Sequence, residues 1–438
     1  MNNILLLSIV SLLLSILVYI KSSGEIMCSS FTTLSSLALG SFLLYLQSVL
    51  WEIELYNTAF FLLVYGLVTI TIADLYAQKK YRKRDCDKDM EYKYISIRFC
   101  GVLLFVYMLS TLFYSVEIYR LGKMIGYDDL SAIGEVKANI EELSTQMNPI
   151  VRQMYKVVTS ASYIHSFIFA SNVFLAKSKW MKEIKHLIPF LCTIIITLAS
   201  GGRLNIYKVM IGLIFIVYMI LRESSHWKKL YIGAMLKIGV PLLLGFVILF
   251  SSVSLIVKNN ADIREKKEAI EYISYYAGSP IQVFNIKIED GRKKWASDIW
   301  GYGTFSGIYK LLGVEADAKT KRNGSGMVDI GGVANYAGNA FTIFGRSYLD
   351  FGGVGMCIFM FISYFMFGRY YFKYLLNSYS SYKRNLRLMF YTYCYSSIIA
   401  LAFYDNCYWI LLSSTGLFTL LVLSTMYWIY FKKLLMLS

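Results

Sequence analysis

The stretch GNAFTIFGRSYLDFGGVG, residues 338–355, carries the pattern that decides the fold. Most of its residues are apolar, aromatic or glycine, as in a helix that enters lipid, yet it also contains Arg346 and Asp350. Residues four apart share one face of a helix. Charged side chains within a membrane span are energetically costly and are typical of functional sites. The stretch therefore predicts a membrane helix that begins with a pair of charges.

The composition of the whole chain agrees with a membrane location. Of its 438 residues, 57% are hydrophobic and 16% are charged, and the mean hydropathy is +0.51. A spanning helix needs about 20 apolar residues, and about eleven such runs can be counted. They lie near residues 4–20, 28–50, 57–77, 95–117, 153–176, 187–200, 204–221, 231–257, 346–368, 388–404 and 408–430. We therefore expect an all-α polytopic membrane protein, one integral membrane domain over residues 1–438 with about ten to twelve transmembrane helices.

The short loops predict the orientation. One set of loops is rich in Lys and Arg and alternates along the chain with a set that holds a single arginine. Because cytoplasmic loops carry an excess of Lys and Arg, the basic set is predicted to be cytoplasmic. The basic set is 79–93, 177–185, 222–229 and 369–387, and the poor set is 51–57, 200–203 and 404–407. The C-terminus is then cytoplasmic and, with eleven spans, the N-terminus is external. Because the charge of +16 lies mostly in these loops, we do not expect a nucleic-acid partner.

Two longer loops are expected on the outside. Residues 118–152 show apolar residues at helical spacing with acidic residues opposite, which predicts an amphipathic helix. Residues 258–345 mix both signs of charge with many aromatic residues and glycines, which predicts a partly ordered external cap and not a linker.

The sequence gives little support for a metal site or for a proton relay. The three histidines and seven cysteines are scattered and form no ligand spacing, so we expect no metal and no cofactor. No run of Asp, Glu or His follows the spans as a proton relay would. His165 lies within a span, where a hydrogen-bonded core residue is the favoured interpretation.

Arg203 is the first candidate for binding an anion. It follows Gly201 and Gly202 in LASGGRLNIYK, residues 198–208, where one span ends and the next begins. Glycines let a ligand approach the backbone, helix N-termini attract anions, and a guanidinium suits phosphate. The competing interpretation is that Arg203 extends to lipid headgroups. Lys208, in the same stretch, is a further candidate for substrate binding.

Arg346 and Asp350 are the second pair of candidates. They either neutralise each other within the helix, or Asp350 holds the guanidinium while its other edge binds an anionic substrate. Arg152, in MNPIVRQMYK, and Arg264, in NNADIREKKEAIEYI, are weaker substrate-binding candidates. For Arg152 contact with lipid headgroups is favoured, and for Arg264 a solvated loop.

The two stretches 198–213 and 338–355, with a large external loop between them, resemble the oligosaccharide repeat-unit polymerases, the Wzy-type O-antigen and capsule polymerases. The resemblance implies an all-helical fold like that of the GT-C membrane glycosyltransferases. It implies a donor and an acceptor linked to undecaprenyl pyrophosphate, a periplasmic active site, no metal and no nucleotide sugar. A chain-length regulator is a further implied partner. Onto this chain the resemblance carries Arg203, Arg346, Asp350 and Tyr348, although the RX10G pattern of some members has no exact match at Arg203.

The sequence thus predicts a metal-independent glycosyltransferase that polymerises lipid-linked repeat units. Arginines would stabilise the charge of the leaving pyrophosphate, and Asp350 would either orient an arginine or accept the proton of the attacking hydroxyl. Two alternatives stay open: an O-antigen ligase, which shares the chemistry, and a flippase or transporter of lipid-linked glycans.

Overall fold

The computed structural model describes residues 2–82, 92–126, 136, 146–200, 203–228, 269–314, 328–329, 337–338 and 340–434. Within these residues the chain is helical, apart from the short antiparallel pair β1 (Val328–Asp329) and β2 (Ala337–Gly338). Eight of the described helices are long and apolar enough to cross a membrane. A polytopic helical membrane protein is therefore confirmed, whereas the count of eleven spans stays a prediction.

The predicted runs coincide with helices wherever the structure describes them. The run 231–257 and Arg264 lie outside the described residues, as do residues 127–135 and 137–145 around the predicted amphipathic helix. Three of the runs form short or divided helices: α9 (Ile188–Ala199), α18 (Tyr382–Cys394) continued by η4 (Tyr395–Ile399), and α19 (Tyr408–Leu411) before α20 (Ser414–Trp428). The remaining runs form α1 (Asn3–Lys21), α2 (Ser29–Gln47), α3 (Asn57–Tyr81), α4 (Cys100–Met124), α7 (Pro149–Ala170) with η1 (Ser171–Leu175), α10 (Arg203–Ser224) and α17 (Thr342–Tyr370).

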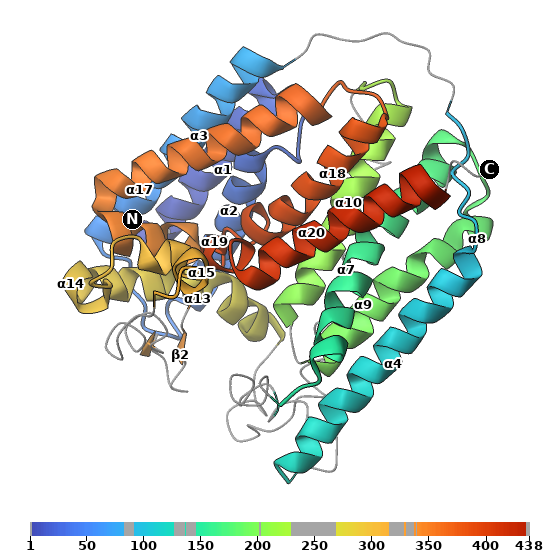
Figure 1. Ribbon diagram of the computed structural model, residues 1–438. Helices are drawn as coiled ribbons and strands as arrows, with labels where there is room; N and C mark the ends of the chain where they lie inside the picture. The colour runs from blue at the N-terminus through green and yellow to red at the C-terminus, as the bar shows by residue number, and fades with distance from the viewer. Residues whose placement is uncertain are drawn as a thin grey trace. The chain divides into compact units, whose positions relative to one another are not determined.

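The chain divides into two compact units. Unit 1 comprises Met1–Arg84, Ile263–Leu376 and Cys394–Leu417, and unit 2 comprises Asp85–Asp262, Asn377–Tyr393 and Phe418–Ser438. In unit 1, α1, α2, α3 and α17 form a bundle, with α17 packed along α3 (Figure 1). Gly66 permits this contact, because a Cβ there would lie 2.5 Å from the ring of Phe344.

The predicted external cap contains a helix that belongs to the bundle of unit 1. This helix, α13 (Ala269–Glu289), packs against α2. A Cβ on Gly40 would lie 2.6 Å from the carbonyl oxygen of Ala277, so the two backbones approach closely. Near the C-terminal end of α13, Asn285 donates to the Glu54 carbonyl at 2.7 Å and accepts from the Tyr56 N–H at 3.0 Å. The interpretation of residues 258–345 as only a cap was therefore incomplete.

A break in α17 positions the start of this helix. Gly352 has φ 74° and ψ −177°, a conformation that is essentially restricted to glycine. The break leaves two carbonyls without helical partners, and Arg292 of α14 (Arg292–Trp295) donates to both. Its Nε reaches the Leu349 oxygen and its Nη2 the Asp350 oxygen, each at 2.7 Å. Arg292 therefore holds the segment that carries Arg346 at the break in α17.

Unit 2 packs α4, α7, α9 and α10 side by side (Figure 1). Asn148 caps α7 by accepting from the Ile150 N–H, and Pro149 occupies the first turn. Two of the four helices, α4 and α7, contribute to a row of buried polar side chains.

That row is a hydrogen-bonded chain through His165. The Tyr107 and Tyr430 hydroxyls lie 2.5 Å apart, and the Tyr430 hydroxyl lies 3.0 Å from His165 Nε2. His165 Nδ1 lies 2.9 Å from His186 Nδ1, and His186 Nε2 lies 3.7 Å from Glu183. His165 is thus the hydrogen-bonded core residue that the sequence favoured. The partners of His165 come from segments far apart in the chain. A row of polar residues of this kind therefore leaves no continuous run of Asp, Glu or His in the sequence.

Candidate functional site

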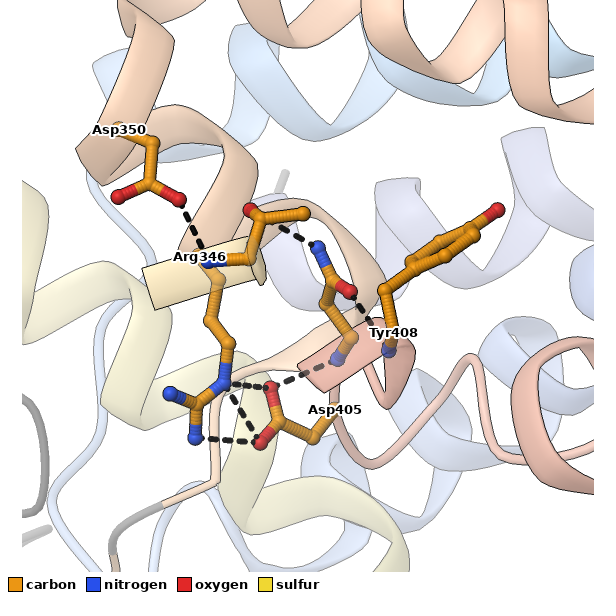
Figure 2. Close-up of polar contacts among 6 residues, drawn as sticks. Arg346, Asp350, Asp405 and Tyr408 are labelled. Carbon is orange, nitrogen blue, oxygen red and sulfur yellow. Dashed lines mark hydrogen bonds and ion pairs between the residues drawn. The ribbon is translucent and has the colours of Figure 1, made fainter. Parts of the chain in front are cut away.

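An ion pair between Arg346 and Asp405 forms the centre of the candidate site in unit 1 (Figure 2). Arg346 Nε lies 3.0 Å from both carboxylate oxygens of Asp405, and Nη2 lies 2.8 Å from Oδ2. The side chains are 15% and 6% exposed, so both charges are largely removed from water. The paired edge is the Nε–Nη2 side of the guanidinium, and among the described residues Nη1 has no acceptor.

The same segment that carries Asp405 closes the N-terminus of α17. The N–H groups of Thr342 and Ile343 donate to the carbonyls of Tyr404 and Ala402, at 3.0 and 2.8 Å. The next two donors of the turn are also occupied, by the Thr342 hydroxyl and the Phe341 carbonyl. The first-turn N–H groups of α17 are therefore not open to an anion, and the arginine side chain is what remains for binding.

Asp350 does not hold the guanidinium of Arg346. Its carboxylate accepts from the N–H groups of Gly303 at 3.0 Å and Thr304 at 2.6 Å, in the first turn of α15 (Tyr302–Leu311). A carboxylate at this place satisfies donors that a helix leaves unpaired and faces the positive end of its dipole. Asp350 thus anchors α15 to α17, and neither of its predicted roles is supported by these contacts.

We expect Asp350→Asn to weaken the protein without abolishing its activity. The amide keeps one acceptor for α15 but loses the charge and one of the two hydrogen bonds, which lowers the free energy of unfolding by about 1 to 2 kcal/mol. Thermal unfolding of the purified variant measures this loss, with the exposed Asp298→Asn as a control. Complete inactivity of a fully folded Asp350→Asn protein would instead return Asp350 to the catalytic role.

A second chain connects α15 to the ion pair. Asn406 donates through its backbone N–H to Asp405 Oδ1 at 2.7 Å, and its side chain contacts the Thr304 hydroxyl at 3.4 Å. Its amide oxygen accepts from the Tyr408 N–H at 3.2 Å. Because Asn406 and Thr304 are fully buried, the Asp405 carboxylate is held rigidly in front of Arg346, as Figure 2 shows.

Lys287 of α13 lies beside this pair with its ammonium group buried. The side chain is 1% exposed, and among the described residues Nζ has no hydrogen-bond partner. Nζ lies 4.1 Å from the ring centre of Phe341 and 4.6 Å from that of Trp295. The guanidinium of Arg346 lies 5.5 Å from the centre of the same Phe341 ring, so one aromatic side chain contacts two cations.

The surroundings of Lys287 affect its protonation. Burial, and to a smaller extent the nearby Arg346, lower the pKa of the ammonium from 10.5 to about 8, with Asp405 opposing both. A lysine in this state is charged at neutral pH and loses its proton within the mildly alkaline range.

The described residues of the site contain more donors than acceptors. Two cations, Lys287 and Arg346, face one carboxylate, Asp405, because Asp350 is committed to α15. Trp409, whose ring lies 5.2 Å from the Arg346 guanidinium, has a buried indole N–H without a partner in the described part of the chain. Unsatisfied buried donors of this kind cost about 1 to 3 kcal/mol each. The arrangement therefore favours a ligand that is negatively charged and rich in acceptor oxygens.

The other predicted site residues are distributed over both units. Tyr348 packs its ring against Phe284 at 6.0 Å, in unit 1. Arg203, Lys208 and Arg152 belong to unit 2. There α10 begins at Arg203 as predicted, Lys208 is buried, and Arg152 is exposed. The structure thus places Arg346, Tyr348 and Asp350 in one unit, and among these only Arg346 belongs to the donor-rich cluster.

Asp405 and Lys287 were not identified from the sequence. A signal for Asp405 existed: YDNC, residues 404–407, is a short loop between apolar runs that contains a single carboxylate. Lys287 had no comparable signal, because it lies among many charges of both signs. In the described part of the chain no group of three or more His, Cys, Asp or Glu side chains is placed to hold a metal ion.

Comparison of the chain with protein-family models, curated proteins and solved structures finds no match. The functional argument therefore depends on the residues of the chain itself.

Proposed function

We propose that the protein polymerises oligosaccharide repeat units linked to undecaprenyl pyrophosphate, and that the cluster of Arg346, Lys287 and Trp409 binds the pyrophosphate of the donor. One observation carries the proposal: a buried ammonium that has no hydrogen-bond partner among the described residues lies near an arginine that is already paired with Asp405. The resemblance of residues 338–355 to the Wzy-type polymerases supplies the class of substrate.

The reaction gives this cluster a defined task. The hydroxyl of one lipid-linked repeat unit attacks the anomeric carbon of the growing glycan, and the bond from that carbon to the pyrophosphate oxygen breaks. Negative charge develops on the leaving oxygen, where fixed donors in a dry site stabilise it most strongly. Lys287 and Arg346 Nη1 supply such donors and replace the metal ion that many other transferases use.

The contacts within unit 1 support an active site on the outer face of the plasma membrane. The N-terminus, the loop 51–57 and the loop 404–407 are all predicted to be external. Asn3 donates to the Leu55 carbonyl at 2.8 Å, which places the first two together, and Asn285 ties the loop 51–57 to α13. Lys287 lies two residues beyond Asn285. Eleven spans and a GT-C-like arrangement of helices complete the proposal.

A gene deletion in a host that makes lipopolysaccharide tests the proposed function. Loss of a polymerase should leave a single repeat unit on the lipid A core in place of a ladder of chain lengths. Loss of a ligase should remove glycan from the core while lipid-linked polymer accumulates. Loss of a flippase should remove core-linked glycan and leave only single lipid-linked units. Gel analysis of lipopolysaccharide with mass spectrometry of the lipid-linked glycans separates these outcomes, and the last two contradict the proposal.

A further inference from the structure

A second arginine, Arg384 of α18, is buried in unit 2 with its most selective edge unused. The side chain is 4% exposed, and Nη1 lies 3.2 Å from Glu223 Oε2 and 3.3 Å from Asn385 Oδ1. Nε and Nη2 are buried and have no partner among the described residues. These two atoms form the edge that binds two oxygens of one anion side by side. In Arg346 the same edge holds Asp405.

Further donors without partners in the described part of the chain lie around Arg384. The ring of Trp227 lies 5.9 Å from the guanidinium, and its buried indole N–H has no acceptor among the described residues. Ser380 donates its backbone N–H to Glu223 Oε1 at 2.6 Å, while its buried hydroxyl makes no hydrogen bond to any residue that the structure describes. Arg384, Trp227 and Ser380 thus bring three types of donor to one place in unit 2.

The nearby carboxylate does not satisfy these donors. Glu223 is fully buried, and one of its oxygens accepts from Ser380. The other lies 3.2 Å from Nη1, makes no hydrogen bond to the described residues, and leaves the Nε–Nη2 edge unpaired. A buried donor left without an acceptor costs about 1 to 3 kcal/mol, and more when it is charged. The cluster is therefore completed by a molecule that brings several acceptor oxygens on one small centre.

We propose that the Arg384 cluster binds a phosphate group. A tetrahedral phosphate offers two oxygens to the Nε–Nη2 edge and further oxygens to the indole and the hydroxyl, and the planar guanidinium suits it better than an ammonium. Glu223 keeps the cluster from attracting every anion, because a ligand must gain enough hydrogen bonds to offset repulsion from this carboxylate.

The position in the chain limits the source of the phosphate. Trp227 belongs to loop 222–229, and Ser380 and Arg384 to loop 369–387, both of which are predicted to be cytoplasmic. The group comes either from the headgroup of an anionic phospholipid in the inner leaflet or from free phosphate. This site is separate from the Arg346 cluster of unit 1, so the inference does not depend on the proposed glycan chemistry.

Binding to purified protein tests the proposal in two arms. All proteins carry Lys287→Met in a maltoside detergent, which removes the unpaired ammonium of unit 1 from the measurement. In the first arm inorganic phosphate is titrated and the rise of the melting temperature is recorded. In the second arm native mass spectrometry compares retention of phosphatidylglycerol with that of a neutral galactolipid that contains no phosphate.

Arg384→Lys is the decisive variant, and Arg387→Lys, at an exposed position of the same helix, is its matched control. The lysine keeps the charge opposite Glu223, so the fold is preserved, but it loses the two-pronged edge. We expect Arg384→Lys to weaken binding about tenfold or more and Arg387→Lys to leave it unchanged. A response to phosphate alone assigns a free-anion site, and selective retention of phosphatidylglycerol assigns a headgroup site. Failure of both arms in the Lys287→Met protein, or equal binding by Arg384→Lys, would overturn the proposal.

Discussion

Arg346→Ala is expected to abolish chain growth while the protein remains folded and inserted. Removal of one fixed donor from a charge-stabilising site commonly lowers the rate by roughly 100- to 1,000-fold, or about 2.7 to 4 kcal/mol. The loss at Arg346 should reach the upper end, because the alanine also leaves Asp405 buried without its cation and brings a negative charge close to the place proposed for the pyrophosphate. Lipopolysaccharide or capsule ladders in a deletion strain complemented with each variant measure the effect.

Two further variants separate catalysis from simple headgroup contact. Arg346→Lys keeps the charge but cannot hold Asp405 through Nε and Nη2 and at the same time present a third nitrogen, so we expect poor rescue. If Arg346 merely reached lipid headgroups, lysine would work nearly as well. Arg369→Ala, near the other end of α17, provides the matched control and should retain a normal ladder. A full ladder from Arg346→Ala would remove this residue from the mechanism.

Arg203 is tested in the same ladder assay, as a second candidate for binding the pyrophosphate. It begins α10 as the sequence predicted, and the resemblance that carries Arg346 also carries Arg203. The double variant Arg203→Ala, Arg346→Ala should produce no ladder at all. A ladder lost with Arg346→Ala but kept with Arg203→Ala would show that Arg203 takes no part in the reaction.

The helices were predictable from the sequence because burial in lipid is decided by local composition. The apolar run 346–368 corresponds to α17, which spans Thr342–Tyr370. The helix begins four residues earlier than the run because backbone bonds to Ala402 and Tyr404 organise its first turn. Such bonds depend on a segment about sixty residues away, and local hydropathy carries no information about them.

The site was predictable only in part, because its contacts join distant segments. The spacing of four residues pointed from Arg346 to Asp350, which does lie one turn further on the same helix. The stronger partner, Asp405, lies 59 residues away and forms three hydrogen-bond contacts with Arg346. Asp350 found its own partners in α15, where the first turn of a helix attracts a carboxylate. In the folded protein Asp405, and not Asp350, therefore pairs with Arg346. Of the predicted pair, only Arg346 remains part of the candidate site.

The burial of Lys287 was still harder to predict from the sequence. In the sequence it is one lysine within a polar loop of both signs of charge, and nothing in its neighbours indicates burial. The packing of α13 on α2 and the rings of Phe341 and Trp295 remove it from water. Its functional interest follows from that burial and could not have been predicted before the fold was known.

Pyrophosphate binding is expected to depend on pH through Lys287. Only the charged ammonium attracts the anion, and its pKa is lowered from 10.5 to about 8 by burial and by Arg346, with Asp405 opposing. Affinity for inorganic pyrophosphate, measured by calorimetry on the purified protein, should be highest below pH 8 and fall as the pH rises through that value. Lys287→Arg should remove this decrease, because a guanidinium stays charged throughout. Lys287→Met should weaken binding by about 1.5 to 3 kcal/mol, or roughly 10- to 150-fold, at pH 7.

The free energy of unfolding should rise with pH as Lys287 loses its proton, whereas the affinity for pyrophosphate should fall. These opposite pH dependences make the prediction specific to Lys287. Between pH 8 and 10.5 the unfolded chain holds a proton on this lysine that the folded protein has lost. The free energy of unfolding therefore rises with pH in this window, by at most about 3 kcal/mol, and Lys287→Met abolishes the rise. Lys310→Met, at a solvent-accessible lysine of unit 1, should leave both pH profiles unchanged. An affinity for pyrophosphate that stays constant from pH 7 to 10 in the wild-type protein would show that the Lys287 ammonium does not contact the anion.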